Sequence, residues 1–268
     1  MFAHCAPQRS SALASGSAAL MPADAAAAAV TPSPAPPGVA TGFAVLDAFL
    51  PWGGWPVGAM SEILTERCGA GELSLLLPAM ARLAAEKRPI VLIGLPHEVF
   101  APALLQAGVD PHQVTQIYPG ATVRDVKALL WSSEQILRSG SAALVVLWSL
   151  GRPEPPIEAL RRLHLAGLGK TASFIHYRAV SCRGQPSPAW LRCGFWPTAE
   201  TIELEVFKCR GRLTARPRIT LDRRAVEARL AAHLHARLAL KRALSEGLSS
   251  ESPPPIAAQP QPWTALAR

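Results

Sequence analysis

Cysteine and long apolar runs are both scarce in this chain of 268 residues. The five cysteines are an odd number and form no C-x-x-C pair, which argues against a disulfide framework or a structural zinc site and fits a reducing cytoplasm. No apolar run reaches the roughly 18 residues of a membrane helix before Asp, Pro or Arg interrupts it. The Ala-rich start lacks a basic region before its apolar part, so it does not resemble a secretory signal. We therefore expect a cytoplasmic protein with no membrane partner.

Apolar side chains and positive charge are plentiful instead. With 49% hydrophobic residues the chain can bury one good core. The net charge is +8, but its distribution is uneven: residues 41–150 carry −2, residues 151–222 carry +6 and residues 223–268 carry +4. The basic half is where we expect an acidic partner to bind, although ordinary solubility also accounts for such a charge.

Both ends of the chain are low in complexity. Residues 1–38 contain an Ala run followed by VTPSPAPPG, and residues 249–268 form a Pro-rich tail. Such segments have little to bury, so we expect both to be disordered, and Met21 offers a start later than Met1. The expected organisation is a core at 39–222, an amphipathic basic helix at 223–248 and the two tails.

Continuously apolar runs alternate with helical patterns inside the core. The expected buried strands are 89–95, 142–147 and 172–177, and the expected helices are 73–87, 100–107, 123–139 and 157–168. This alternation predicts a mostly parallel sheet that is covered on both faces. Thr201–Lys208 alternates in polarity as a half-exposed strand does, and we expect Arg218–Leu221 to pair with it across a turn at Gly211. The predicted fold class is α/β with a small antiparallel extension.

The stretch ILTERCGAGELSLLL (63–77) comes close to a phosphate-binding loop, G-x-x-x-x-G-K-[ST]. If Gly71 is the second glycine, Glu72 takes the lysine position and Leu73 takes the hydroxyl position. Gly69 and Gly71 keep a backbone able to bind an anion, but a carboxylate about 4 Å from a phosphate costs about 1 kcal/mol in water and about 4 at an effective dielectric of about 20. An acid at a helix start also needs no ligand to explain it. We expect Gly69, Gly71 and Glu72 to form a vestigial loop that holds no cofactor.

The stretch just before this loop, VATGFAVLDAFLPWGGWPVGAMSEIL (39–64), resembles the beginning of the RecA-type recombinase core. The matching features are Thr41-Gly42, Leu46-Asp47, Gly53-Gly54, Pro56, Gly58 and Glu62-Ile63. The resemblance continues in order through 97–114, AALVVLW and 161–178, so it covers about 40–222. It implies a RecA-like core with a parallel sheet.

The chain departs from the recombinases at the residues that handle ATP. The strand that should end in a Mg²⁺-directing Asp ends in Val146-Leu147-Trp148. Pro96 stands where the recombinase has its water-orienting Glu, and the next acid is Glu98. The two stretches that would form DNA-binding loops, 151–156 and 181–188, are short. With the Lys position also changed, the sequence predicts a degenerate ATP site and no enzyme.

A RecA-like core with these changes resembles the ImuA family of the SOS mutagenesis cassette. The resemblance implies a non-catalytic adaptor of translesion DNA synthesis after DNA damage, acting beside the Y-family polymerase-like ImuB and an error-prone polymerase, with the RecA filament as a further partner. Three alternatives stay open. They are a cell-division inhibitor like the related, shorter SulA, a residual or partner-completed ATPase, and a plain module that binds single-stranded DNA.

The basic half contains cations interleaved with aromatics. The candidate residues for binding DNA or a partner are Arg183, Arg192, Lys208, Arg210, Arg212, Arg216 and Arg218, among Trp190, Phe195 and Trp196. This composition is typical of a groove for single-stranded DNA, where charge follows phosphates and rings stack on bases. The alternative is that the aromatics fill the core and the cations are solvated.

The clearest helix pattern is RRAVEARLAAHLHARLALKRALSEGL at 223–248. Val226, Leu230, Leu234 and Leu238 step by four along one side, and Arg and Lys populate the rest. Such a helix either packs back on the core or binds in a partner groove. Our hypothesis is that this helix and the tail recruit the polymerase-like partner.

No metal or catalytic cluster is predicted. His97, His112, His164 and His176 lack the spacing of metal ligands, and His233 and His235 lie on different sides of the helix. Glu203 and Glu205 share one face of a strand, but nothing in the sequence gives them a pocket, so we expect a solvated pair.

Overall fold

The computed structural model describes residues 38–118, 126–211, 217–223 and 239, all within the compact unit Ala35–Arg268. Nearly all of the expected N-terminal tail, the whole of the C-terminal tail and most of the expected helix 223–248 lie outside the described residues. The four leucine and valine positions proposed for the partner helix, Val226, Leu230, Leu234 and Leu238, are among those left out.

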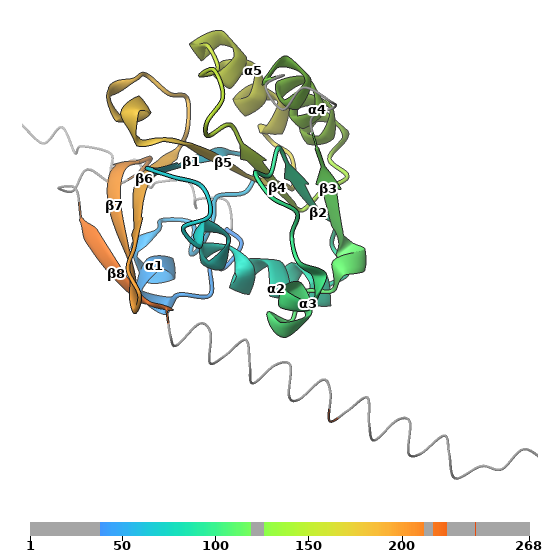
Figure 1. Ribbon diagram of the computed structural model, residues 1–268. Coiled ribbons are helices and arrows are strands. Elements are labelled where there is room, and N and C mark those ends of the chain that lie inside the picture. Colours follow the sequence, from blue (N-terminus) through green and yellow to red (C-terminus); the bar gives the residue numbers. More distant parts are fainter. Residues whose placement is uncertain (1–37, 119–125, 212–216, 224–238, 240–268) are drawn as a thin grey trace, which may run out of the picture. The chain divides into compact units, whose positions relative to one another are not determined.

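A single sheet of eight strands forms the centre of this unit (Figure 1). Its order is β3-β2-β4-β5-β1-β6-β7-β8, with parallel pairing from β3 to β6 and antiparallel pairing of β6 with β7 and of β7 with β8. The strands are β1 Met60–Thr65, β2 Ile90–Ile93, β3 Val114–Ile117, β4 Leu144–Trp148, β5 Ser173–Ala179, β6 Leu191–Pro197, β7 Thr201–Cys209 and β8 Arg218–Asp222.

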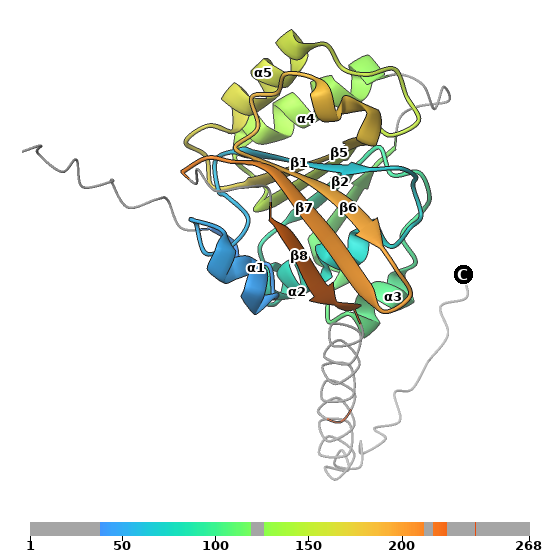
Figure 2. The same ribbon diagram turned by 90° about the vertical axis from the view of Figure 1, so that its left-hand side faces the viewer.

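Helices cover both faces of the sheet, as Figure 2 shows from the side. One apolar core lies between the sheet and α1 Ala44–Phe49, α2 Leu77–Ala85 and α3 Ala101–Gln106. The other lies between the sheet and α4 Val126–Ser139 and α5 Ile157–Gly167. Three short 3-10 helices complete the described elements: η1 Glu72–Leu75, η2 Pro111–Gln113 and η3 Val180–Gly184. Because the central strands are buried on both faces, they read as continuous apolar runs in the sequence.

The predicted α/β class, with a mostly parallel sheet, flanking helices and an antiparallel extension, is confirmed. The expected continuous helix over 73–87 is wrong, because η1 ends at Leu75 and α2 begins only at Leu77. Pro78 has no N–H to donate to Ser74 and favours the first turn of a helix, so a new helix begins there. Three strands were also not predicted from the sequence: β1, which contains Ser61 and Glu62, the short β3, and β6, which contains Arg192 and Gly194.

The Gly53-Gly54 pair sets the close approach of two backbone segments before β1. Val39 and Trp55 form an isolated antiparallel bridge across this turn. A Cβ on Gly54 would lie 2.1 Å from the Val39 carbonyl oxygen, whereas a Cβ on Gly53 would meet no atom within 4 Å. The second glycine is therefore required by packing as well as by its backbone angles.

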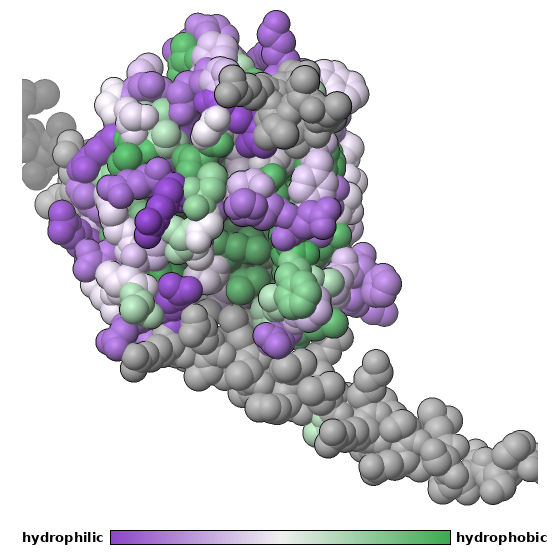
Figure 3. Space-filling model, in the orientation of Figure 1, coloured by the Kyte–Doolittle hydropathy of each residue, from purple (hydrophilic) through white to green (hydrophobic). Residues whose placement is uncertain are grey.

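Apolar side chains are also present on the surface of the described unit. Figure 3 shows such side chains gathered over α2 and α3 on the face seen in Figure 1. Phe100 is 70% exposed, and Leu105 and Tyr118 are also exposed. None of the helices in the described part of the chain has both the length and the apolar character that crossing a membrane requires.

Candidate functional site

The loop that the sequence predicts to be a vestigial phosphate loop, with Gly69, Gly71 and Glu72, connects β1 to η1. Gly71 adopts the left-handed conformation, with φ 87°, and precedes the first residue of η1, Glu72. The Glu72 side chain is turned inward and only 5% of the residue is exposed. Its Oε1 accepts a hydrogen bond of 3.0 Å from the Gly69 backbone N–H. In a phosphate loop the backbone N–H groups bind the phosphate oxygens, so here a carboxylate of the chain itself takes up one of these donors.

Two stacked and buried aromatic rings lie next to the loop, and one of them forms a hydrogen bond with it. The Tyr177 hydroxyl donates a hydrogen bond of 2.7 Å to the Glu72 carbonyl oxygen. The Tyr177 ring stacks on Trp148, with centroids 5.0 Å apart and planes at 16°. Burial, and then the charge of Glu72, raise the Tyr177 pKa well above 10, so its hydroxyl keeps the proton that it donates. Trp148 stands where the resemblance placed a Mg²⁺-directing acid, and it is part of the apolar core.

Two cations lie close to this loop. Arg152 follows β4, and its Nη1 donates to the carbonyl oxygens of Gly94 and Trp148 at 3.0 Å each. Burial lowers the Arg152 pKa, and the nearby Cys68 partly opposes that shift. The second cation is Arg223, whose Nη2 is 3.2 Å from the position of a Cβ on Gly71. Any side chain at position 71 would crowd this guanidinium as well as strain the backbone.

A second cluster of charges is buried in the middle of the sheet. Glu62 on β1 accepts from Arg178 Nη1 of β5 at 3.0 Å and from Arg192 Nε of β6 at 2.7 Å. Glu62 and Arg178 are completely buried, and Arg192 is 7% exposed. Buried charges of this kind are stable only when they are paired and hydrogen-bonded. Here the carboxylate takes both guanidinium groups, one on each oxygen.

The same cluster holds the two loops that the resemblance aligned with DNA-binding loops. Glu154, in the first loop, accepts from Arg178 Nη2 at 3.1 Å. In the second loop, Gln185 Oε1 accepts from the same Nη2 at 2.9 Å and the Ser187 hydroxyl donates to Glu62 at 2.7 Å. Both loops are therefore connected to the sheet through charge-assisted hydrogen bonds.

The structure divides the predicted set of basic residues. Arg192 is not on a surface groove: besides Glu62 it donates to the carbonyl oxygens of Cys182, Arg183 and Gln185, which corrects its assignment as a residue that contacts DNA or a partner. Arg183 forms an ion pair with Glu205 and lies over the Phe207 ring, 4.1 Å from its centroid. Glu205 is thus paired rather than simply solvated. Arg218 lines a separate small cavity with Trp196, Glu203 and Glu205.

Of the remaining basic candidates, Lys208 and Arg210 are brought together beside Trp190. Arg212 and Arg216 lie outside the described residues. Phe195 is buried in the core, as its alternative interpretation expected, and Trp190 packs against that core. The structure thus gathers two of the predicted cations and one aromatic, and separates them from Arg183 and Arg218.

No group of three His, Cys, Asp or Glu side chains in the described ranges is arranged to hold a metal ion. His176 is completely buried, and its Nε2 lies 2.9 Å from the Ser149 hydroxyl. Burial, followed by the charge of Arg178, lowers its pKa well below 6.5. His176 is therefore a neutral core residue at neutral pH.

Sequence reasoning missed the Glu62–Arg178–Arg192 cluster. The available signal was a single charged residue inside each of three otherwise apolar runs, AMSEIL, FIHYR and WLRC. A lone charge in a buried strand requires a partner, but the pattern does not say which strand supplies it.

No protein-family model matches this chain, and no curated protein matches it. Among solved structures, SulA from Pseudomonas aeruginosa is similar at 25% sequence identity and a TM-score of 0.36, over 46% of this chain and 99% of that one. A TM-score of 0.36 does not establish a shared fold.

Proposed function

We propose that the chain is a non-catalytic, RecA-like adaptor of the SOS-induced translesion DNA synthesis machinery, supporting error-prone replication past DNA damage. The observation that carries the non-catalytic part is the hydrogen bond from the Gly69 N–H to the Glu72 carboxylate. A nucleotide phosphate would have to displace the Glu72 carboxylate from the Gly69 N–H and would then lie next to that negative charge.

The energetic cost of that exchange supports the proposal. Glu72 is almost fully buried, so its repulsion of a phosphate about 4 Å away lies nearer about 4 kcal/mol than the value of about 1 kcal/mol in water. Each 1.4 kcal/mol weakens binding about tenfold. The loop also lacks the lysine whose attraction would offset the repulsion, since Glu72 itself occupies that position.

The adaptor role rests on the resemblance of residues 40–222 to RecA-type cores and to the ImuA family. That resemblance supplies the partners that we propose: the polymerase-like ImuB, an error-prone polymerase and the RecA filament. The hydrogen bonds that hold both short loops to Glu62 and Arg178 support a role as a binding scaffold, because these loops are fixed by the protein's own side chains.

The test has a binding arm and a cellular arm. In the first, Mg-ATP is titrated by calorimetry into the full chain, into Glu72→Lys and into Glu66→Lys, whose acid is exposed on the same loop. We expect no measurable heat of binding from the parent or from Glu66→Lys. If a lysine at position 72 restores Mg-ATP binding, only Glu72→Lys should give heat. Micromolar binding by the parent chain would refute the non-catalytic assignment and favour an ATPase.

In the cellular arm, the frequency of damage-induced mutations is measured in a strain that lacks this chain and carries either the parent or Glu72→Gln. Glu72→Gln keeps a side-chain oxygen for the Gly69 N–H, so we expect both to restore induced mutagenesis. An unchanged mutation frequency on loss of the chain would refute the pathway. Filamentous cells on expression of the parent alone would instead support a cell-division inhibitor.

A further inference from the structure

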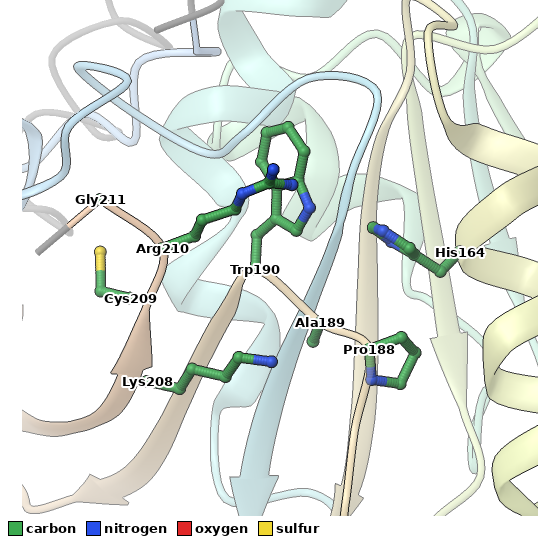
Figure 4. Close-up of a pocket in the computed structure, with 8 residues that line it drawn as sticks. All are labelled: His164, Pro188, Ala189, Trp190, Lys208, Cys209, Arg210 and Gly211. Atoms are coloured by element: carbon green, nitrogen blue, oxygen red, sulfur yellow. The ribbon is translucent and has the colours of Figure 1, made fainter. Parts of the chain in front are cut away.

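A cavity of about 430 Å³ opens where α5, the segment before β6 and the end of β7 meet (Figure 4). Its apolar part is formed by Pro188, Ala189 and Trp190, and its polar part by His164, Lys208 and Arg210. Figure 4 shows the Arg210 guanidinium over the Trp190 ring, at 4.3 Å from the centroid, with the His164 ring on the opposite side of the opening. This cavity lies apart from the vestigial phosphate loop, since none of its lining residues belongs to that loop.

The described residues that line this cavity are cationic: they include Lys208 and Arg210 and no Asp or Glu. The acid that acts on Lys208 is Glu62, which is already paired with Arg178 and Arg192. Burial is the main cause that lowers the Lys208 pKa, and Arg192 and Arg210 add to it against the opposing charge of Glu62. The His164 pKa is also lowered, first by burial and then by Lys208 and Arg210, and its Nδ1 is buried without a hydrogen-bond partner among the described residues. The charge of an anion placed here would raise the pKa of both Lys208 and His164, and the anion could accept a hydrogen bond from His164 Nδ1.

The surroundings favour a peptide carboxylate over a nucleic-acid phosphate. A DNA strand is bound by a row of cations along its backbone, but Arg192 is buried on Glu62 and Arg183 is paired with Glu205. Base stacking needs a free ring face. Trp190 already stacks on the Trp52 ring, whose centroid lies 5.9 Å away, and the Arg210 guanidinium lies over its ring, so a base would have to compete with both groups for the ring surface.

A partner protein is the better source of the occupant, because the undescribed segments of this chain carry few acids. Segments 1–37, 119–125, 212–216, 224–238 and 240–268 contain only Asp24, Asp125, Glu227, Glu246 and Glu251, and no two of these are adjacent. We propose that the cavity binds an acidic segment of a partner protein, with carboxylates on Lys208 and Arg210 and an adjoining apolar side chain against Pro188 and Trp190. This inference goes beyond the proposed function and holds whether or not the partner belongs to a polymerase assembly.

The experiment uses the full chain and fluorescence anisotropy. The probe is a fluorescein-labelled peptide with aspartates on both sides of a leucine–phenylalanine pair, compared with its asparagine analogue and with labelled oligothymidine. We expect the acidic peptide to bind, the asparagine analogue to bind at least about tenfold more weakly, and Lys208→Gln and Arg210→Gln each to weaken the acidic peptide about tenfold. The matched control is Arg161→Gln, an exposed cation on the same helix as His164, which should leave binding unchanged.

Two further measurements keep the test independent of folding. Because Lys208 also donates to the Ser187 carbonyl oxygen at 3.0 Å, Arg210→Lys is included; it keeps the charge and should retain most of the affinity. Nitrogen NMR of His164 should show its pKa rising when the acidic peptide binds. Three results would each overturn the proposal. Oligothymidine could bind more tightly than the acidic peptide and be weakened by the same variants, Arg161→Gln could weaken the acidic peptide as much as they do, or the acidic peptide could fail to bind even at low salt.

Discussion

Replacing Glu62 with glutamine tests whether the buried charge cluster stabilises the fold. The substitution keeps the size of the side chain but removes the charge that two guanidinium groups share. The amide also offers only one oxygen, so Arg178 and Arg192 cannot both keep their present hydrogen bonds. Both cations would remain buried in the sheet without a full counter-charge.

The expected cost follows from the burial of the cluster. Removing one partner of a buried ion pair costs about 3–5 kcal/mol, since the remaining charge stays desolvated. For a domain of this size 1 kcal/mol corresponds to about 2–4 °C, so the melting temperature should fall by about 6–20 °C. An exposed ion pair contributes only about 0–1 kcal/mol, so the measured loss of stability separates a buried cluster from a surface pair.

The assay is urea unfolding followed by circular dichroism, with the midpoint and slope fitted for the parent, Glu62→Gln and Glu158→Gln. Glu158 is an exposed acid on α5 and serves as the control. We expect a lower midpoint with an unchanged slope for Glu62→Gln, and a loss of no more than about 1 kcal/mol for the control, which is the most that an exposed acid in the first turn of a helix contributes. A loss below about 0.5 kcal/mol at position 62 would refute the reasoning, because the cluster would then behave as a surface pair.

Two further predictions concern other buried positions. The pKa of His176 is lowered in the folded state, so below pH 6.5 the unfolded chain binds more protons at this residue. The free energy of unfolding should therefore decrease as the pH is lowered, by up to about 1.4 kcal/mol per pH unit. Urea midpoints measured at several pH values should depend less on pH in His176→Gln than in the parent. Gly54→Ala places a Cβ against the Val39 carbonyl and should cost more than 2 kcal/mol, whereas Gly53→Ala should cost only the roughly 1 kcal/mol of a left-handed residue. Equal urea midpoints for the two alanine variants would contradict the steric explanation.

Much of the architecture follows from patterns that are local in the sequence. The apolar runs around Ile90–Ile93 and Leu144–Trp148 predict buried parallel strands, and the alternation in Thr201–Cys209 predicts a half-exposed strand. These patterns succeed because the side-chain period of each element is fixed by its own backbone geometry. The break at Pro78 was not predicted, although proline cannot donate the hydrogen bond that a continuous helix needs.

The sequence also shows an acid, Glu72, where the predicted phosphate-binding motif has its lysine. The direction of that carboxylate, and the hydrogen bond that Tyr177 donates to the same turn from more than 100 residues away, depend on how the chain folds. Likewise, residues 116 and 130 positions apart from Glu62 supply its two cations. The sequence of one strand does not specify which strand will lie next to it, so the partners of a buried side chain are set only when the chain folds.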